Sequence, residues 1–321
     1  MRTPNPGRLI VATRRSRLAR TQTDLVVDAL RSAHDGLEVE VLEVTTIGDR
    51  DRRPFAEIGG KGLFTSEVEN ALVEGRADIA VHSAKDLTAR LAPGCTIVCV
   101  PARAPREDVV VGGAGDRGEQ RLDALPPGTT VGTSSLRRRS LLVESRRDLE
   151  MVELRGNLDT RLEKVRSGSV GAAILAAAGL GRLGMAAEGA ALDPEWWVPA
   201  PGQGALAVEA LEGRADLRDL LAALEDPVAT AELGAERAFA ERLEGGCSVP
   251  LGCSARVDGD RIAITVYLGS HDGHSMRERL SGAVADAAEL GAELADAVLA
   301  AGGDRILAAI ESRDLPQVDV P

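Results

Sequence analysis

Aromatic side chains are nearly absent from this chain, and positive charge is outnumbered. Phe, Trp and Tyr make up 2% of the 321 residues, and 38 Lys and Arg stand against 50 Asp and Glu, giving a formal net charge of −12. Proteins that bind nucleic acids usually have the opposite charge balance, together with aromatic rings on which bases stack. We therefore expect no nucleic-acid partner.

Long apolar runs and cysteines are also scarce. No run approaches the length of a membrane span, and residues 1–8 lack the apolar core of a signal peptide. These absences predict a cytoplasmic protein with no membrane partner. In such a reducing compartment, four cysteines in a chain of this length argue against structural disulfides.

The cysteines do not have the spacing of a metal site. Cys95 and Cys99 lie on one predicted strand, about 13 Å apart at the usual rise per residue, which is too far for one ion to bridge. The other two cysteines and the pair His271 and His274 are spaced unlike the common zinc knuckles. We expect no metal.

Lysine is the third rarity, because the lysines are only Lys61, Lys85 and Lys164. The first two fall in motif-like stretches, Gly-Gly-Lys-Gly-Leu-Phe and His-Ser-Ala-Lys-Asp-Leu, which indicates a need for a compact ammonium. Asp86 follows at the end of a predicted strand, where a carboxylate could stabilise developing positive charge or move protons. A surface Lys-Asp pair is the alternative. His82 takes an apolar position in the alternating pattern of the predicted strand, so it is predicted to be a core residue.

Arginine is abundant, and its most informative cluster is Gly-Thr-Ser-Ser-Leu-Arg-Arg-Arg at residues 132–139. A short strand is predicted at 129–131 and a helix at 136–149. The serines would stand at the helix start, where unpaired N–H groups and the helix dipole favour a carboxylate or phosphate. Arg137 and Arg138 would add forked donors. The alternative is a surface helix that merely begins with basic residues.

Similar turns recur, which favours the anion site. Residues 9–16 again predict a strand, a Thr-Arg turn and a helix start. At 154–157, Leu-Arg-Gly-Asn places Asn157 as an N-cap, with Arg161 one turn further on, and Gly-Leu-Gly-Arg at 179–182 follows an apolar run. Arginines in several strand-to-helix turns predict a cleft at the carboxyl ends of α/β strands. Positive charge focused in this way within an acidic chain predicts a small polyanionic ligand.

Alternating strands and helices fill roughly the first two thirds of the chain, and a different pattern follows. A Pro/Arg-rich segment at 100–106 predicts a hinge between two α/β units. Residues 199–204 predict that the chain crosses back to the first unit, where residues 205–209 form a returning strand. Asp226 and Pro227 are a good N-cap and N1 pair. The helix, three strands and further helices that follow predict a small α+β domain.

Residues 243–252, Leu-Glu-Gly-Gly-Cys-Ser-Val-Pro-Leu-Gly, are the other conspicuous site. Two glycines before Cys247 and a proline after it predict a tight, exposed loop, whereas a structural cysteine usually lies inside an apolar strand or helix. A reactive or modified thiol is therefore predicted at Cys247, and an ordinary small core residue at Cys253.

Together, these motifs resemble those of the porphobilinogen deaminases, also called hydroxymethylbilane synthases. The motifs that match, in order, are Ala-Thr-Arg, Gly-Gly-Lys-Gly-Leu-Phe, His-Ser-x-Lys-Asp, Gly-Thr-Ser-Ser-Leu-Arg-Arg, Leu-Arg-Gly-Asn, Pro-Gly-Gln-Gly and Leu-Glu-Gly-Gly-Cys. The departures are Ala84, Thr88 where a proline is common, and the second thiol at Cys253. The resemblance implies two periplasmic-binding-protein-like (type II) α/β lobes and a small C-terminal α+β domain. The expected domains are residues 1–100 with 200–221, residues 101–199, and residues 222–321.

The resemblance also implies the chemistry: four porphobilinogen molecules are joined on a dipyrromethane cofactor, which is attached by a thioether to Cys247. Each added ring brings an acetate and a propionate, which arginines would hold. Asp86 is implied as the catalytic residue, stabilising a substrate cation and assisting proton transfer. The implied cofactor-binding residues are Cys247, Lys85, Thr133, Ser134, Ser135, Arg137, Arg138, Arg155 and Gly156. The implied substrate-binding residues are Arg14, Ser16, Lys61, Phe64, Arg161, Arg182 and Gln203.

Two other classes of protein stay open beside this enzyme, which the resemblance implies to be a monomer. Two such lobes also make up solute-binding proteins for small anions, although those usually carry an export signal and need no loop thiol. A thiol enzyme acting on an acyl substrate, with His82 as its base, would have no evident use for clustered arginines.

Overall fold

The structure is a computed structural model that describes residues 8–46, 62, 65–243 and 249–311. The chain divides into two compact units, which are Met1–Ala104 with Ala205–Thr230, and Pro105–Gly204 with Ala231–Pro321. Over the described ranges, no helix combines the length and the apolar character needed to cross a membrane.

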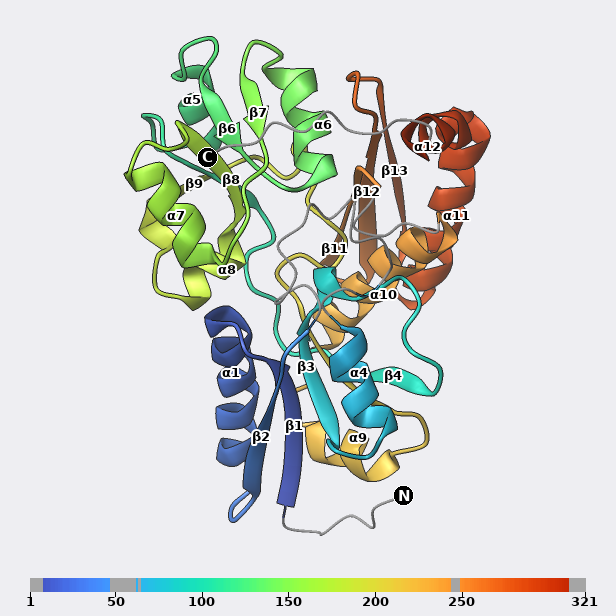
Figure 1. The fold of residues 1–321 in the computed structure, drawn as a ribbon. Coiled ribbons are helices and arrows are strands. Elements are labelled where there is room, and N and C mark those ends of the chain that lie inside the picture. The colour runs from blue at the N-terminus through green and yellow to red at the C-terminus, as the bar shows by residue number, and fades with distance from the viewer. Residues whose placement is uncertain (1–7, 47–61, 63–64, 244–248, 312–321) are drawn as a thin grey trace. The chain divides into compact units, whose positions relative to one another are not determined.

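The first unit is built on a five-stranded sheet in the order β2-β1-β3-β10-β4 (Figure 1). β1 runs parallel to β2 and β3, whereas β10 runs antiparallel to β3 and β4, so the predicted returning strand is confirmed. Its strands are β1 (Arg8–Arg14), β2 (Glu38–Val44), β3 (Ile79–Ser83), β4 (Cys95–Cys99) and β10 (Leu206–Leu211). Its helices are α1 (Arg17–Ala33), α4 (Ser66–Val73), the 3-10 turn η1 (Ala84–Asp86) and α9 (Ala215–Leu221).

Helices cover both faces of this sheet, which explains why its central strands are almost entirely apolar. Leu30 of α1 and Leu221 of α9 pack in one cluster with Val11 of β1. Leu72 of α4 packs on the opposite face with Ala12, the next residue of the same strand. Successive side chains of a strand point to opposite faces, so β1 contributes to both cores.

The second unit contains another five-stranded sheet, in the order β7-β6-β8-β5-β9. β6 is parallel to β7 and β8, and β5 is antiparallel to β8 and β9. The strands are β5 (Asp108–Val111), β6 (Thr130–Gly132), β7 (Glu150–Val152), β8 (Ala172–Ala176) and β9 (Gly189–Ala191). The helices are α5 (Gly118–Asp123), α6 (Leu136–Ser145), α7 (Leu158–Arg166), α8 (Ala177–Arg182) and the 3-10 turn η2 (Ala186–Glu188).

One predicted helix of this unit was too long. The helix expected at 136–149 ends at Ser145, because Arg146 leaves the helix and its guanidinium binds the side chain of Asp148 and the carbonyl of Leu125. The predicted N-cap position of Asn157 is confirmed at the start of α7, although the Asn157 side chain makes no capping hydrogen bond.

The second unit also holds an antiparallel sheet in the order β11-β12-β13, packed against helices. Asp226 accepts hydrogen bonds from the N–H groups of Val228 (2.9 Å) and Ala229 (3.0 Å), which confirms the predicted helix start. The elements are α10 (Pro227–Arg242), whose residues up to Thr230 belong to the first unit, β11 (Leu251–Asp258), β12 (Arg261–Gly269), β13 (Ser275–Ala283), η3 (Val284–Asp286), α11 (Ala287–Val298), η4 (Leu299–Gly303) and α12 (Asp304–Glu311). Two sheets of α/β type, followed by an antiparallel sheet packed on helices, confirm the predicted fold class. The boundaries of the three domains stay a prediction.

The close approach of α11 to α10 yields a stability prediction. A Cβ on Gly291 would overlap the carbonyl oxygen of Ala235, whereas a Cβ on Gly234 meets nothing within 4 Å. Gly291→Ala should therefore lower the free energy of unfolding by about 1–3 kcal/mol, as overpacking does. Gly234→Ala should raise it by up to about 1 kcal/mol, because alanine is the better helix former. Denaturant unfolding measures both, and equal effects of the two variants would contradict this packing.

Candidate functional site

Two strands of the first unit bring Arg14 and Asp86 together. Arg14 ends β1, and Asp86 lies in the turn η1 directly after the parallel neighbour β3. Its carboxylate oxygen lies 4.0 Å from Arg14 Nη1, and the two side chains are 20% and 36% exposed. Lys85 belongs to the same turn. The predicted catalytic carboxylate is thus held beside a predicted substrate arginine and keeps access to solvent.

Neighbouring side chains in this unit have structural roles. Ser16 Oγ accepts a hydrogen bond from the Ala19 N–H (3.3 Å) and caps α1. Gln22 of α1 donates to Ser83 Oγ (2.8 Å), which fixes the strand end before Asp86. His82 is 5% exposed, so the prediction of a core histidine is confirmed.

The contact that His82 makes disfavours its use as a base for a thiol enzyme. His82 Nε2 lies 3.0 Å from Glu209 Oε2, and both side chains are buried. Nearby, burial raises the pKa of Glu69. These residues form a buried polar cluster within the core of the first unit.

In the second unit, the turns after β6 and β7 meet at one edge of the sheet. Thr133 N–H donates to the carbonyl of Val152 (3.0 Å), and Ser134 Oγ donates to the carbonyl of Leu154 (2.7 Å). Gly156 has a φ of +105°, a conformation that suits glycine. The structure therefore brings together two of the predicted anion-binding turns.

The start of α6 has the features of an anion site. Ser135 Oγ accepts from the Arg138 N–H (3.4 Å), and the Ser135 N–H donates to Thr133 Oγ1 (3.2 Å). Within the described part of the chain, the N–H groups of Ser134, Leu136 and Arg137 have no acceptor. Such groups at a helix start attract carboxylates and phosphates.

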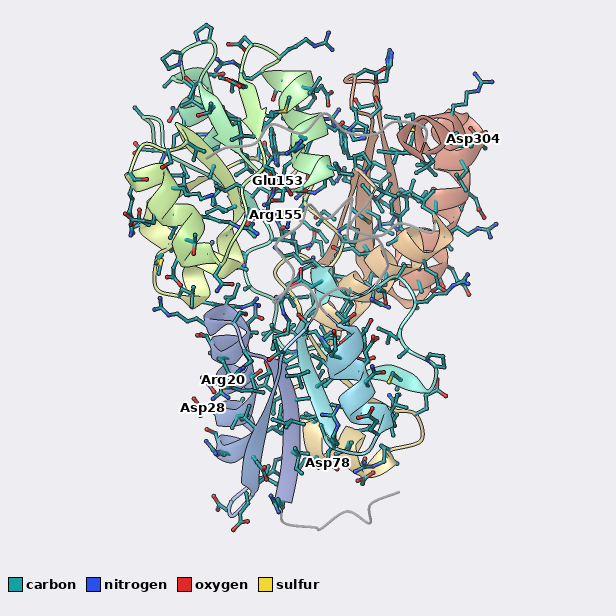
Figure 2. All side chains as sticks on the ribbon, viewed as in Figure 1. Arg20, Asp28, Asp78, Glu153, Arg155 and Asp304 are labelled. Carbon is teal, nitrogen blue, oxygen red and sulfur yellow. The ribbon has the colours of Figure 1, made fainter. Side chains whose placement is uncertain are left out.

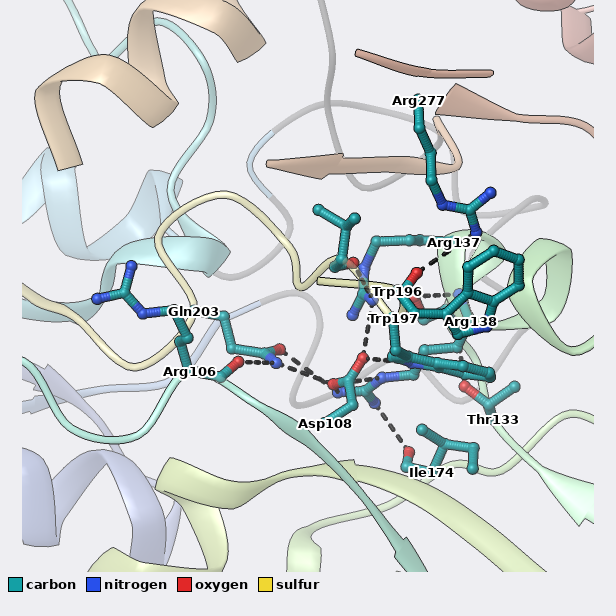
Figure 3. Close-up of polar contacts among 12 residues, drawn as sticks. Arg106, Asp108, Thr133, Arg137, Arg138, Ile174, Trp196, Trp197, Gln203 and Arg277 are labelled. Carbon is teal, nitrogen blue, oxygen red and sulfur yellow. Dashed lines mark hydrogen bonds and ion pairs between the residues drawn. The ribbon is translucent and has the colours of Figure 1, made fainter. Parts of the chain in front are cut away.

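The side chains of Arg137 and Arg138 differ from the expectation that they face a ligand. They are 3% and 7% exposed, and both bind the fully buried carboxylate of Asp108. Arg137 Nη1 lies 2.7 Å from Asp108 Oδ2, and Arg138 Nη2 lies 2.7 Å from Oδ1 (Figure 3). Trp197 Nε1 and Gln203 Nε2 also donate to this carboxylate, at 2.9 and 2.8 Å. We call these five residues the Asp108 cluster.

The electrostatics of the Asp108 cluster leave an excess of positive charge. Burial alone would raise the pKa of Asp108, but the charges of Arg137 and Arg138 outweigh it and hold this pKa well below its usual range. Burial lowers the pKa of Arg137, and Asp108 opposes that effect. Two guanidiniums share one carboxylate, and the buried Nε of Arg137 has no hydrogen-bond acceptor among the described residues.

The other predicted arginines of this unit make hydrogen bonds to carbonyls or to an acidic side chain. Arg155 Nε donates to Glu153 (2.8 Å), which Figure 2 labels beside it, and Arg161 Nε donates to the carbonyl of Gly156 (2.9 Å). Arg182 Nη2 donates to the carbonyl of Gly204 (2.7 Å), and burial lowers the pKa of Arg182 to about 10.

Arg182 is the last residue of α8, so its predicted position in a strand-to-helix turn was wrong. The apolar run that precedes residues 179–182 divides into the strand β8 and the first residues of this short helix. Its guanidinium nevertheless reaches Gly204, the residue next to Gln203, and so adjoins the Asp108 cluster.

Three predicted site residues, Cys247, Lys61 and Phe64, lie outside the described residues. Cys253 is fully buried in β11, which agrees with the prediction of a core residue. In the described ranges, no group of three His, Cys, Asp or Glu side chains is placed to hold a metal ion.

Cys247 lies in sequence between α10 and β11, and these two elements are joined by a buried acid. Glu236 of α10 accepts from the Ala255 N–H of β11 (2.9 Å). The same carboxylate accepts from the Gly202 N–H (2.6 Å), in the segment that precedes β10. The elements on both sides of the predicted reactive thiol are therefore fixed to each other.

Sequence reasoning missed Asp108 and Trp197. Asp108 opens a strand whose four residues are all buried, and a carboxylate in such a strand requires cationic or N–H partners. That requirement was a usable signal, because Arg137 and Arg138 are adjacent cations at the start of a nearby helix. No local pattern pointed to Trp197.

Strand-end turns that offer N–H groups and arginines define an α/β protein that binds a small polyanion. The family model described as "Porphobilinogen deaminase, dipyromethane cofactor binding domain" matches residues 9–219, and "Porphobilinogen deaminase, C-terminal domain" matches 230–300. The chain therefore belongs to the porphobilinogen deaminase family.

Two porphobilinogen deaminases of high sequence identity agree with this assignment. A porphobilinogen deaminase of Roseiflexus castenholzii is 47% identical over 302 residues, which cover 94% of this chain and 98% of that protein. One from Bordetella parapertussis is 46% identical over 304 residues, covering 94% and 96%. Among solved structures, the methionine-binding protein MetQ aligns with a TM-score of 0.42 and 13% identity over 68% of this chain and 91% of that one.

The lowered pKa of Asp108 predicts how acid affects stability. A depressed carboxylate pKa contributes stability that is present above the unfolded-state value, near 3.8, and is lost as the pH falls toward the folded-state value. Asp108→Asn leaves two buried cations without a counter-charge, which should cost about 3–5 kcal/mol in the free energy of unfolding.

We expect this difference from the unsubstituted protein to stay constant between pH 8 and about 5, and to narrow only below about pH 4. Urea unfolding across this range measures it. Asp148→Asn, which disrupts an exposed pair with Arg146, is the control and should have little effect. A difference that already vanished near pH 6 would mean that Asp108 is not held ionised by the two arginines.

Proposed function

We propose that the chain is a hydroxymethylbilane synthase. It would condense four porphobilinogen molecules with loss of ammonia and release the linear tetrapyrrole hydroxymethylbilane, as part of porphyrin biosynthesis. The observation that carries this proposal is the family match over nearly the whole chain, supported by the unpaired N–H groups and the excess positive charge at the start of α6. We further propose that it works as a cytoplasmic monomer.

The residues present fit a covalent dipyrromethane cofactor. Its acetate and propionate groups need several cationic and N–H donors, and the start of α6 offers N–H groups and the unpaired Arg137 Nε. When bound, this cofactor supplies the pyrrole α-carbon to which the first substrate is joined. The residues that would hold it are Cys247 as the thioether, with Lys85, Thr133, Ser134, Ser135, Arg137, Arg138, Arg155 and Gly156.

The substrate carboxylates require a further set of cations. Arg182 suits this role because its guanidinium is desolvated and, within the described ranges, binds a carbonyl and no acid, so an anion would stabilise it. The other residues proposed to bind substrate are Arg14, Ser16, Lys61, Phe64, Arg161 and Gln203. The amide of Gln203 donates to Asp108, so we assign it to supporting the arginines.

Asp86 is the proposed catalytic residue. As the C–N bond of porphobilinogen breaks, the ammonia leaves with its electron pair, and the substrate becomes a methylene-pyrrole cation. The carboxylate of Asp86 would stabilise this cation electrostatically. After the new C–C bond forms, the attacked pyrrole α-carbon loses its proton, and Asp86 would assist this transfer. Arg14, 4.0 Å away, helps to hold the carboxylate in place.

The thioether assignment predicts the mass of the protein. Chain purified from a host that makes tetrapyrroles should be heavier than its sequence by two linked pyrrole units. Cys247→Ser should abolish the added mass, and Cys253→Ser should keep it, because Cys253 is buried in β11. Intact-protein mass spectrometry makes the measurement. Added mass that depended on Cys253 would refute the attachment site.

The role of Asp86 predicts a defect in turnover with little change in binding. Asp86→Asn removes the charge and keeps the shape, so cofactor-loaded variant should lose on the order of a hundredfold or more in kcat for porphobilinogen. Asp24→Asn is the matched control, since Asp24 also lies 4.0 Å from an arginine in the same unit, yet on the outer part of α1. Near-normal turnover by loaded Asp86→Asn would remove Asp86 from the mechanism.

A further inference from the structure

The carboxylate of Asp108 already has a complete set of donors from the chain itself. Oδ1 accepts from Arg138 Nε (3.1 Å), Arg138 Nη2 (2.7 Å) and Gln203 Nε2 (2.8 Å). Oδ2 accepts from Trp197 Nε1 (2.9 Å) and lies 2.7 Å from Arg137 Nη1. Five N–H donors use up the acceptor capacity of a carboxylate, so Asp108 has no acceptor site left for a ligand.

The two arginines differ in what they have left to donate. Arg138 uses Nε and Nη2 on Asp108, Nη1 on the carbonyl of Ile174 (2.9 Å) and reaches Gln203 Oε1 at 3.5 Å. Toward the residues that the structure describes, Arg137 donates through Nη1 alone, to Asp108 and to the carbonyl of Val198 (2.8 Å). Its buried Nε has no acceptor among these residues. Arg137 therefore has the N–H groups that are still available to a ligand, and we assign the surplus positive charge of the Asp108 cluster to it.

We propose that Asp108 is a positioning residue for installation of the cofactor. In the empty protein it acts as an internal counter-ion, holding both guanidiniums at the start of α6 before any ligand carboxylate arrives. Arg138 serves mainly to neutralise and fix Asp108, and Arg137 presents the donors that meet the ligand. This proposal rests on the proposed function.

Without Asp108, the two cations would repel each other and lose their shared acceptor. A buried, uncompensated charge is relieved when its side chain rotates toward water, so the arginines would leave the geometry that receives a carboxylate. Misplacement by about 1 Å can cost on the order of a hundredfold in rate. Asp108→Asn should therefore slow cofactor installation even where the protein stays folded.

Two double variants separate the roles of the arginines at equal charge. The natural cluster has two cations and one anion, a surplus of one positive charge. Asp108→Asn with Arg138→Gln, and Asp108→Asn with Arg137→Gln, each leave one cation and no anion, so the surplus is again one. The pair differs only in which arginine remains.

The experiment starts from apo-protein made in a host that cannot make porphobilinogen. Each variant is checked by thermal unfolding and near-UV circular dichroism, then incubated with porphobilinogen, and the gain of covalent mass is followed over time. We expect Asp108→Asn to load at least about tenfold more slowly than the control Asp148→Asn. The double variant that keeps Arg137 should recover most of the loading rate, and the one that keeps Arg138 should not.

Equal loading by the two double variants, or loading of Asp108→Asn at the control rate, would overturn the proposal. If the double variants do not fold, Asp108→Glu decides, because it keeps the charge: it must load faster than Asp108→Asn. Failure of the unsubstituted protein and of Asp148→Asn to gain mass would instead refute the proposed function. The two failures are thus distinguishable.

Discussion

The organisation of the second unit depends on the burial of one ionised carboxylate, that of Asp108. An acid in an apolar interior is strongly unfavourable unless donors surround it, and here donors come from the start of α6 and from the segment that leads back to β10. One side chain thus fixes the beginning of a helix against the strand β5. Because two cations share this single acid, the same contact that stabilises the fold leaves positive charge for an anionic ligand.

The strand order of both α/β sheets explains why chemical groups collect where they do. Neighbouring parallel strands end at the same edge, so the turns after them lie together. In the first unit this places Arg14 beside Asp86, and in the second it places Thr133 and Ser134 beside the turn that begins at Leu154. These residues lie in turns, where side chains are less constrained by core packing than in strands and polar groups can be placed.

The sequence predicted the elements well because their signals are local. The cap at Asp226, the short strand predicted at residues 129–131 and the helix start at Ser135 each follow from patterns within a few residues. The partner of Arg138 could not be predicted in this way, since Asp108 lies 30 positions earlier and the contact depends on the sheet order. Local signals also failed to predict the helix that ends at Arg182, because one short apolar run contains both the end of a strand and the start of this helix.

The C-terminal sheet adds a second constraint on helix α6. Arg277 of β13 donates both Nη groups to Glu144 of α6, at 2.7 and 2.9 Å, and its guanidinium stacks 4.0 Å from the Trp196 ring centroid. Tyr267 Oη lies 2.7 Å from Ser140 Oγ, and burial raises the pKa of Tyr267 to about 12, so it stays neutral in this bond. Helix α6 is therefore held at its start by the Asp108 cluster and along its length by β12 and β13.

This double attachment bears on how a covalent cofactor can be used. Cys247 lies in sequence between α10 and β11, which belong to the same compact unit as α6. The attachment point and the helix start proposed to hold the cofactor carboxylates therefore share one framework. Asp86 and Arg14 belong to the other unit. Most of the N–H groups and cations proposed to hold the cofactor carboxylates thus belong to the compact unit that also carries the proposed thioether position, whereas Lys85 belongs to the other unit together with the proposed catalytic residue Asp86.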